Sequence, residues 1–451
     1  MRMALSMEPM GRHTTKLPRR ALVALALAAT LLRLGLVLCY RTHEFHYPGI
    51  AHCPDELRLL RTGATCIDPD QYLRLGQSIL TDGRFWLDGR PNAFRTPGYP
   101  LLVAATGANI KLLVVVQCLL GGLTVLLLGV IGARLAGRFG GLAAAGLQAL
   151  DVSALLHTGM VMSESLFALL LVLGLWLYLR RSTLLSALVL GAAVLVRPVG
   201  AILLVPFALP MVLQRRWLLL GAFVAGFAVL PMAWALRNWS QYRRLTLATA
   251  GAYNAFNNSI EVLARSRGAS YQVLRDSVVE RIVMVVPEGN PPALAAGLER
   301  AALGVALREP TRTFLRWAAG MPRLMFSLKA DDIVVRLTDE RAGTCRARDL
   351  LWSGPTGSTR VATWLLAAWE LAALVGSCLL AALVLIRRGR RDWQVLLAGI
   401  AFSLIAVASP LVDGRYRDPV MPVLYLLAGA GLSAVVTAIG STRQRKQSPA
   451  A

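Results

Sequence analysis

The segment from Asp68 to Tyr72 reads Asp-Pro-Asp-Gln-Tyr, so two carboxylates stand close to an aromatic side chain. Apolar positions follow at helical spacing as far as Leu80, which predicts that a helix begins here with the carboxylates in its first turn. A helix N-terminus stabilises an ionised carboxylate, and a positioned carboxylate can take a proton from a reacting hydroxyl. Capping of the helix by Asp68 or Asp70 is the structural alternative.

Other polar residues border long apolar segments, where ionisable groups are costly and become candidates for function. They are Glu164 after Ser163, Arg197 before Pro198, the pair Arg237-Asn238, and the triplet Arg415-Tyr416-Arg417. Arginine presents a planar fork that binds phosphate oxygens in pairs, so we expect the arginines to hold an anion. The structural alternatives are a capped helix start at Glu164 and a snorkelling side chain at Arg197.

The chain that must position these residues has 451 residues, of which 56% are hydrophobic and only 16% are charged. A membrane-spanning helix needs about 20 apolar residues, and apolar segments of similar length recur along the whole sequence. The segments expected to cross the membrane are 21–40, 109–131, 139–157, 163–180, 182–197, 198–213, 217–235, 361–386, 393–411 and 419–438. The predicted fold class is an all-α polytopic membrane protein with about ten transmembrane helices.

The formal net charge is +23, and clusters of arginine fall in the short turns between apolar segments. No nucleic-acid-binding motif accompanies them, so we interpret them as residues that set the orientation in the membrane. With the N-terminus in the cytoplasm, every second turn is basic, and the C-terminal basic tail 439–451 also lies inside. Residues 1–438 then form one membrane domain with two outer loops, 41–97 and 236–360, in which interfacial helices are expected.

The spacing of Asp68 and Asp70 is also that of a pair that holds a divalent metal ion. A zinc site is a second, weaker interpretation, with residues of the first outer loop as ligands: His43, His46, His52 and Cys53. We predict no required metal and no certain cofactor, and a divalent ion is the cofactor that the pattern leaves open. Cys53 and Cys66 share the outer loop and are candidates for a disulfide bond.

A carboxylate and several arginines on one face of a membrane protein suit sugar transfer from a lipid-phosphate carrier. The carboxylate would act as general base, and the arginines would hold the phosphate that leaves. A transporter or lipid flippase is the alternative from another class, because charged residues and proline breaks also occur there. It is less favoured, since the two halves show no repeat and the ionisable residues cluster at the outer face. A non-catalytic assembly subunit is a third reading.

Six short motifs keep their order between residue 21 and about residue 438. They are Asp68–Tyr72, Arg95–Pro100, Ser163–Phe167, Arg197-Pro198, Trp234–Asn238 and Arg415–Pro422. In this order they resemble the motifs of bacterial family 39 glycosyltransferases of the GT-C superfamily, which includes protein O-mannosyltransferases and the aminoarabinose transferase of lipid A. Each motif is short, and their joint order with the matching topology makes the resemblance specific.

The resemblance implies a GT-C membrane bundle with interfacial helices, a polyprenyl-phosphate-linked sugar as donor, and inversion at the anomeric carbon. Asp68 matches the position of the family's general base, and Glu164 would lie near the base or the acceptor. The expected phosphate-binding residues are Arg197, Arg237, Arg415 and Arg417. The expected pocket residues are Tyr72, Arg95, Tyr99, Asn238 and Tyr416.

The chain departs from the protein mannosyltransferases at one place. They carry adjacent Asp-Glu, whereas here Pro69 separates Asp68 from Asp70, so either carboxylate can be the base. The acceptor stays open between a lipid, a glycan and a protein. The expected partners are this donor, one of these acceptors and membrane lipid, without nucleic acid. The expected location is the bacterial cytoplasmic (inner) membrane, with both termini cytoplasmic and the active site periplasmic.

Overall fold

A computed structural model describes residues 18–40, 68–286, 290–338, 358–386, 392–411 and 414–447. The histidine-rich segment proposed for zinc lies outside these ranges, as do Cys53, Cys66 and the side chain of Asp68. The described residues are helical apart from loops and one short antiparallel strand pair, β1 (Trp86–Leu87) with β2 (Arg90–Pro91).

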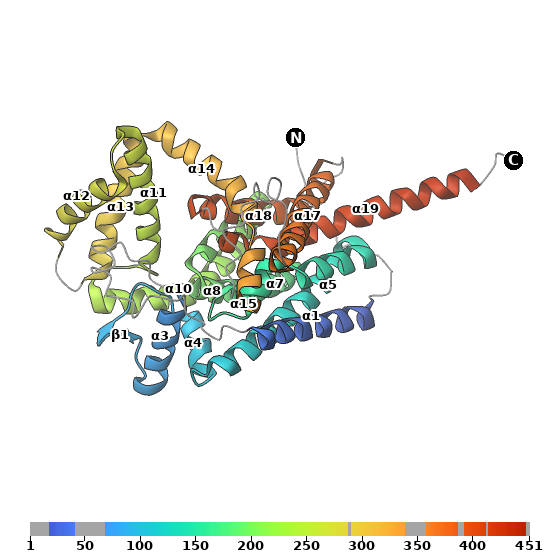
Figure 1. Cartoon of the computed structure of the whole chain (residues 1–451), viewed down its shortest axis with the longest axis horizontal. Coiled ribbons are helices and arrows are strands. Elements are labelled where there is room, and N and C mark those ends of the chain that lie inside the picture. The colour runs from blue at the N-terminus through green and yellow to red at the C-terminus, as the bar shows by residue number, and fades with distance from the viewer. Residues whose placement is uncertain are drawn as a thin grey trace.

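One set of helices forms a bundle, shown in Figure 1 with α1, α5, α7, α8, α17, α18 and α19 labelled. In chain order the bundle contains α1 (Arg19–Cys39), α5 (Ile110–Ala149), α6 (Val152–Thr158), α7 (Glu164–Leu179), α8 (Thr183–Val196), η1 (Pro198–Leu203), α9 (Leu204–Leu213), α10 (Trp217–Tyr242), α17 (Ser358–Ile386), α18 (Asp392–Ala408), η2 (Ser409–Leu411), η3 (Gly414–Arg417) and α19 (Met421–Gln447).

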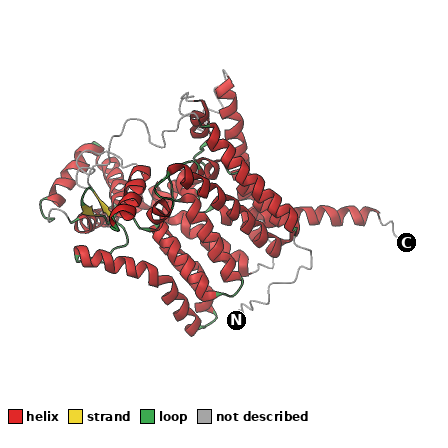
Figure 2. Cartoon of the chain, turned by 90° about the horizontal axis from the view of Figure 1, so that it is seen from below, coloured by secondary structure: helices red, strands yellow, loops and turns green. Residues whose placement is uncertain are grey.

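The remaining helices come from the two segments expected as outer loops, except α4, which directly follows the first of these segments. They are α3 (Asp68–Asp82), α4 (Gly98–Ala105), α11 (Ala250–Arg267), α12 (Tyr271–Val283), α13 (Pro291–Arg308), α14 (Pro310–Met325) and α15 (Ala330–Thr338). Helices α11, α12 and α13 lie together at the left of Figure 1, while α19 extends to the right. The strand pair lies at the same end as α11–α13 (Figure 2).

Five of the described helices are long and apolar enough to cross a membrane: α1, α5, α10, the part of α17 from Val361 to Ile386, and the part of α19 from Met421 to Ser441. Four shorter apolar helical segments accompany them, at Glu164–Leu179, Thr183–Val196, Pro198–Leu213 and Asp392–Ala408. The expectation of an all-α protein with membrane-spanning helices is therefore confirmed. The count of ten crossings stays a prediction.

The long helix α5 reverses direction at Gly137, whose φ of 79° lies in the left-handed region. A glycine adopts this conformation without steric cost. The two arms then pack antiparallel at very close range. A Cβ built on Gly141 would lie 2.5 Å from the carbonyl oxygen of Gly129 and 2.7 Å from the backbone nitrogen of Ala133. Small residues therefore let two backbones of the bundle touch.

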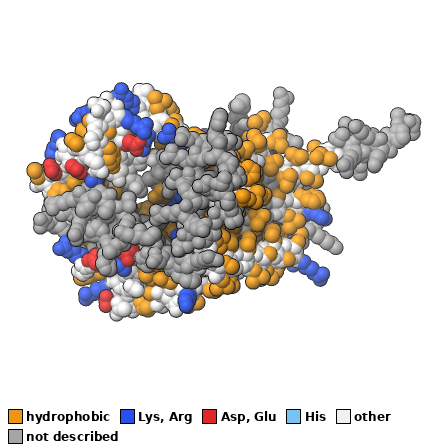
Figure 3. Space-filling model, in the orientation of Figure 1, with side chains coloured by type: hydrophobic (Ala, Val, Ile, Leu, Met, Phe, Trp, Pro, Cys, Tyr) orange, Lys and Arg blue, Asp and Glu red, His pale blue; other side chains and the backbone are white. Residues whose placement is uncertain are grey.

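The core of the bundle is built around α5 and α19, which pack against each other and against α1 and α17. Hydrophobic side chains predominate on the visible surface of this part, whereas charged side chains gather over the end that carries α3 and α11–α13 (Figure 3). Helices α11, α12 and α13 have a separate small core around Phe256, Ile260 and Leu298. Helix α14 connects this unit to the bundle, because the indole of Trp317 donates to the carbonyl oxygen of Ala406 at 2.7 Å.

The glycines of α5 give a direct test of this packing. We expect Gly141→Ala to destabilise the protein, since overpacking of this kind typically costs about 1–3 kcal/mol. Gly146, on the same arm, has nothing within 4 Å of a built Cβ, so Gly146→Ala should leave the melting temperature unchanged or raise it. Thermal unfolding of the two purified variants in detergent measures the difference. Equal melting temperatures would contradict the antiparallel contact.

Candidate functional site

The centre of the charged cluster is the carboxylate of Glu164, in the first turn of α7 and only 4% exposed. Its Oε1 atom lies 2.6 Å from Nη1 of Arg197 and 2.6 Å from Nε of Arg415. Ser163 makes no capping bond through its side chain, and its hydroxyl instead accepts a hydrogen bond from Arg197. The acid at the start of α7 is thus part of a buried ion cluster as well as of a helix first turn.

Arg197 reaches this cluster because Pro198 follows it. A residue before proline is kept out of the α region, and Arg197 has an extended backbone with φ −140° and ψ 118° between α8 and η1. The predicted break at Arg197-Pro198 is confirmed. The residue is 7% exposed and directed into the bundle, so it does not snorkel to water.

Arg415 lies in η3, between α18 and α19, and reaches Glu164 across 251 residues of sequence. Its side chain is 18% exposed, more than those of Glu164 and Arg197. The ring of Tyr416 lies 5.4 Å from the Arg415 guanidinium carbon and 5.8 Å from that of Arg197. The structure therefore brings together four predicted site residues: Glu164, Arg197, Arg415 and Tyr416.

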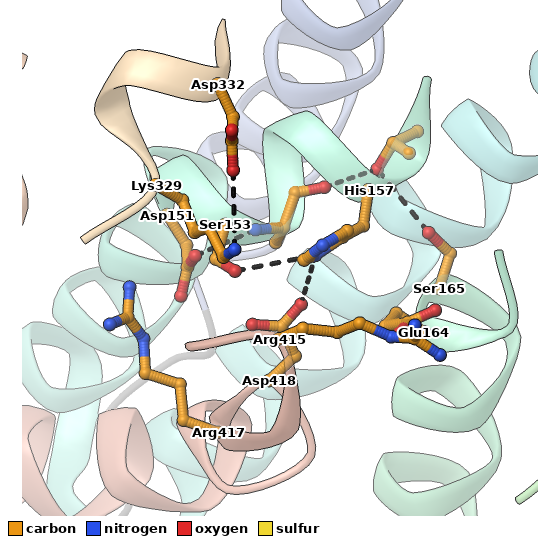
Figure 4. A network of polar contacts seen from close by, with 12 residues as sticks. Asp151, Ser153, His157, Glu164, Ser165, Lys329, Asp332, Arg415, Arg417 and Asp418 are labelled. Atoms are coloured by element: carbon orange, nitrogen blue, oxygen red, sulfur yellow. Dashed lines mark hydrogen bonds and ion pairs between the residues drawn. The ribbon is translucent and has the colours of Figure 1, made fainter. Parts of the chain in front are cut away.

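A second buried pair adjoins this cluster (Figure 4). Nδ1 of His157 lies 2.6 Å from Oδ2 of Asp418 and 3.4 Å from the Ser153 hydroxyl. The hydroxyl of Tyr425 donates to Oδ2 of Asp151 at 2.6 Å. Ser153 and His157 belong to α6, Asp151 is its N-cap, and Tyr425 lies on α19, which Asp418 precedes. These contacts therefore join segments that are distant in the sequence.

Arg417 is 1% exposed and takes part in a different contact from Arg415. Its guanidinium pairs with Glu370 of α17 and donates to the carbonyl oxygens of Met325, at 3.0 Å, and Ser327. Burial alone would lower the pKa of Arg417, but the nearby carboxylates, first that of Glu370, raise it above its usual value. This arginine fixes the end of α14 and the connection to α15 against α17, and it is occupied by protein groups.

Helix α3 is joined to the cluster through two tyrosines. The rings of Tyr72 and Tyr99 meet edge to face at 4.8 Å, and the Arg95 guanidinium lies 5.2 Å from the Tyr72 ring. The Tyr99 hydroxyl donates to Gln117 at 2.6 Å, and the Gln117 amide donates to the carbonyl oxygens of Thr158 and Met160. These last two residues directly precede the segment that carries Glu164.

Asp70 lies in the first turn of α3, as predicted, with Oδ2 3.7 Å from Nη1 of Arg74. Arg74 also pairs with Asp88 next to the strand pair. Asp68 is the first residue of α3. The helix start expected at the Asp-Pro-Asp motif is confirmed, while the choice between the two acids as base stays a prediction.

Arg237 and Asn238 lie on α10, and their bonds hold loops in place. Arg237 donates to the carbonyl oxygens of Asn92, at 2.8 Å, and Phe85, at 3.1 Å, which flank the strand pair. The Asn238 amide donates to the carbonyl oxygen of Thr246 at 2.8 Å. The hydrogen bonds of Arg237 and Arg417 thus differ from those of the arginines at Glu164, and the phosphate-binding role of Arg237 and Arg417 stays a prediction.

The site contains ionisable residues that the sequence interpretation passed over. They are Arg33, Asp151, His157 and Glu370, all less than 9% exposed, while Asp418 is included in a motif without a role of its own. The rule that ionisable groups in apolar segments are functional candidates would have selected Arg33 in α1, Glu370 in α17, and Asp151 and His157 in the segment 139–157. Within the described ranges, no three His, Cys, Asp or Glu residues form a group that could hold a metal ion.

The Arg417–Glu370 contact predicts a large effect on stability. Removal of one partner from a buried ion pair leaves an uncompensated charge and typically costs about 3–5 kcal/mol. We therefore expect Arg417→Met to lower the melting temperature strongly, and Arg417→Met combined with Glu370→Met to recover part of the loss. Arg265→Met is the control, because the Arg265–Glu261 pair is exposed and should contribute little. A double variant no more stable than Arg417→Met would contradict the pairing.

Comparison with known proteins adds no assignment to this geometry: no family model matches the chain, and no curated protein matches it.

Proposed function

We propose that this protein is a membrane glycosyltransferase that moves a sugar from a polyprenyl-phosphate carrier to an acceptor on the outer face of a bacterial cytoplasmic membrane. The observation that carries the proposal is the convergence of Arg197 and Arg415 on the single buried carboxylate of Glu164. Two guanidiniums and one carboxylate leave one positive charge, which suits an anionic phosphate. Arg415 is the more exposed of the two arginines and is the better placed to meet a ligand.

The position of α3 supports a base on Asp68 or Asp70. Both residues lie in the first turn of this helix, and Tyr72, one turn further, packs on Tyr99. A carboxylate at this helix start would take the proton of the acceptor hydroxyl as that oxygen attacks the anomeric carbon, and the carrier phosphate would leave with inversion.

The helix boundaries support the proposed topology of ten crossings. Helix α5 supplies two antiparallel arms, and the four shorter apolar segments α7, α8, η1–α9 and α18 supply further crossings. Helices α11–α14 come from the proposed second outer loop, and α14 is strongly amphipathic, as expected of a helix in the membrane interface. On this topology, α3 and η3 lie on the periplasmic side, where polyprenyl-phosphate sugars would be used.

A transporter or lipid flippase is the second candidate function. It is favoured by Arg33 in α1 and Glu370 in α17, which are buried charges inside helices long enough to cross a membrane. Against it, both side chains are tied to fixed protein groups. Arg33 donates to the carbonyl oxygens of Ala29, at 3.1 Å, and Gln148, at 3.1 Å, and Glu370 holds Arg417.

The proposed base gives the first functional test. Sugar transfer is measured in membranes supplied with a radiolabelled polyprenyl-phosphate sugar pool, for the wild type, Asp68→Asn and Asp70→Asn. Loss of a general base typically lowers the rate about 10²–10⁴-fold, so one variant should lose transfer at an unchanged protein level. If the wild type transfers no sugar, or if both variants transfer it as fast as the wild type, the proposed general base is contradicted and the transporter becomes the preferred function.

The proposed phosphate contact gives the second test. Arg415→Lys keeps the positive charge but removes the planar fork and the Nε donor that meets Glu164. We expect about 10-fold or greater loss of transfer, seen chiefly as a raised KM for the lipid-linked donor. Arg308→Lys is the matched control, because Arg308 is exposed at the end of α13. Equal KM values in the two variants would exclude Arg415 from donor binding.

A further inference from the structure

Helix α14 connects the unit of α11–α13 to the bundle (Figure 1), and two of its sides are covered by protein. On one side, Nη2 of Arg316 donates to the amide oxygen of Asn258 at 2.9 Å and pairs with Glu261 at 2.5 Å, and both partners lie on α11. On another side, the indole of Trp317 donates to the carbonyl oxygen of Ala406 near the end of α18. Helix α14 is therefore fixed to α11 and to the bundle by adjacent residues.

A third side of α14 is apolar and exposed. Phe314 is 60% exposed and Leu315 is 59% exposed, and Ala319, one turn after Leu315, is also exposed. An exposed apolar face on an amphipathic helix marks a surface that meets a partner or a membrane. The neighbouring surface and the distribution of charge identify what covers this face.

The face continues into the exposed apolar surface of α18. The ring centroids of Phe314 and Trp317 lie 5.6 Å apart, and Trp317 is bonded to Ala406, whose neighbour Val407 is 46% exposed. Further from this end of α18, Phe402 is 63% exposed. Helix α18 is one of the shorter apolar helices that cross the membrane in the proposed topology, and lipid tails are as apolar as leucine. Lipid that covers α18 would therefore also reach Phe314.

The charge of this segment favours an anionic lipid. Between residues 300 and 325 the sequence has five arginines and one acidic residue, Glu309. Anionic headgroups attract basic segments that lie at the membrane surface, and a guanidinium binds phosphate oxygens in pairs. A second copy of this chain fits the face less well, since two surfaces with the same excess of positive charge repel each other.

Two of these arginines are placed to meet headgroups. Arg312 and Arg323 are exposed, and the helical spacing puts both beside Leu315, on the side away from Phe314. The apolar side chains can then enter the acyl region while the guanidiniums stay at the level of the phosphates. This division of one helix surface is typical of a helix that lies in the membrane interface.

We propose that the face formed by Phe314, Leu315 and Ala319 binds the acyl chains of anionic phospholipids in the outer leaflet, with Arg312 and Arg323 at their headgroups. The choice of the outer leaflet rests on the proposed topology, whereas the lipid contact itself does not depend on sugar transfer. Lipid covers the third side of α14 and helps to hold α11–α13 against the bundle.

The test is photo-crosslinking of the purified full-length protein in lipid nanodiscs. The probe is phosphatidylglycerol or phosphatidylcholine with a diazirine in its acyl chain, and mass spectrometry of the digested protein locates the adducts. We expect adducts on the peptide that contains Phe314 and Leu315, in a yield about 3-fold or more higher for phosphatidylglycerol. Met284 is the internal control, because it is 82% exposed at the end of α12 and should receive no adduct from either lipid.

Two sets of variants separate the apolar contact from the charge. Leu315→Asp should lower the adduct yield about 3- to 10-fold for both lipids, and its melting temperature in detergent should stay close to that of the wild type, since the side chain is exposed. Arg312→Gln combined with Arg323→Gln should keep the adducts but bring the two yields together. Arg265→Gln combined with Arg281→Gln removes the same charge from exposed positions outside α14 and should leave the preference for phosphatidylglycerol unchanged.

The proposal is overturned if neither lipid labels this peptide, if phosphatidylglycerol is not preferred, or if the preference survives the loss of Arg312 and Arg323. It is also overturned if native mass spectrometry shows that Leu315→Asp converts a dimer into a monomer while the adducts are unchanged, because the face then belongs to a second copy. The cross-link needs no sugar transfer. Labelling in a protein that transfers no sugar retains the lipid surface and removes the transferase, and transfer without labelling does the reverse.

Discussion

The buried contact of Glu164 with Arg197 and Arg415 is the interaction on which the arrangement around the site depends. Three charged groups in an apolar bundle are tolerable only when they meet one another, because an unpaired buried charge is strongly unfavourable. The contact therefore fixes the start of α7, the break between α8 and η1, and the η3 segment before α19 relative to one another. Each is irregular backbone at a helix end, where a polar side chain can turn inward.

Glycines elsewhere in the bundle make room for another buried charge and let helices approach closely. Gly121 lies against the Arg33 side chain, and a Cβ there would come within 2.6 Å of its Nε atom. Gly140 and Gly429 likewise let the second arm of α5 approach α19. Glycine contacts of this kind stabilise helix pairs in an apolar solvent, where burial of apolar side chains provides little driving force. Glycine thus serves both the burial of Arg33 and the close approach of α5 to α19.

Local features of the fold were predictable, because length and apolarity alone mark α1, α10 and α17, and Arg197-Pro198 marks a helix break through proline sterics. The partners of the charges were not. Glu164 meets Arg415 across 251 residues, and Arg417 meets Glu370 across 47, so nothing local distinguishes two arginines that stand two residues apart. Arg415 faces the cluster and Arg417 faces Glu370 of α17 because they lie on different sides of one 3₁₀ turn.

On the proposed function, the net charge at Glu164 has a catalytic meaning. A sugar linked through a phosphodiester carries one negative charge, and the polyprenyl phosphate that remains after transfer gains a second. Two arginines held by one carboxylate leave a fixed positive charge in a medium of low dielectric constant, where it acts more strongly than in water. Such a charge stabilises the doubly charged leaving phosphate more than the singly charged donor. Because this stabilisation increases toward the transition state, it accelerates the transfer.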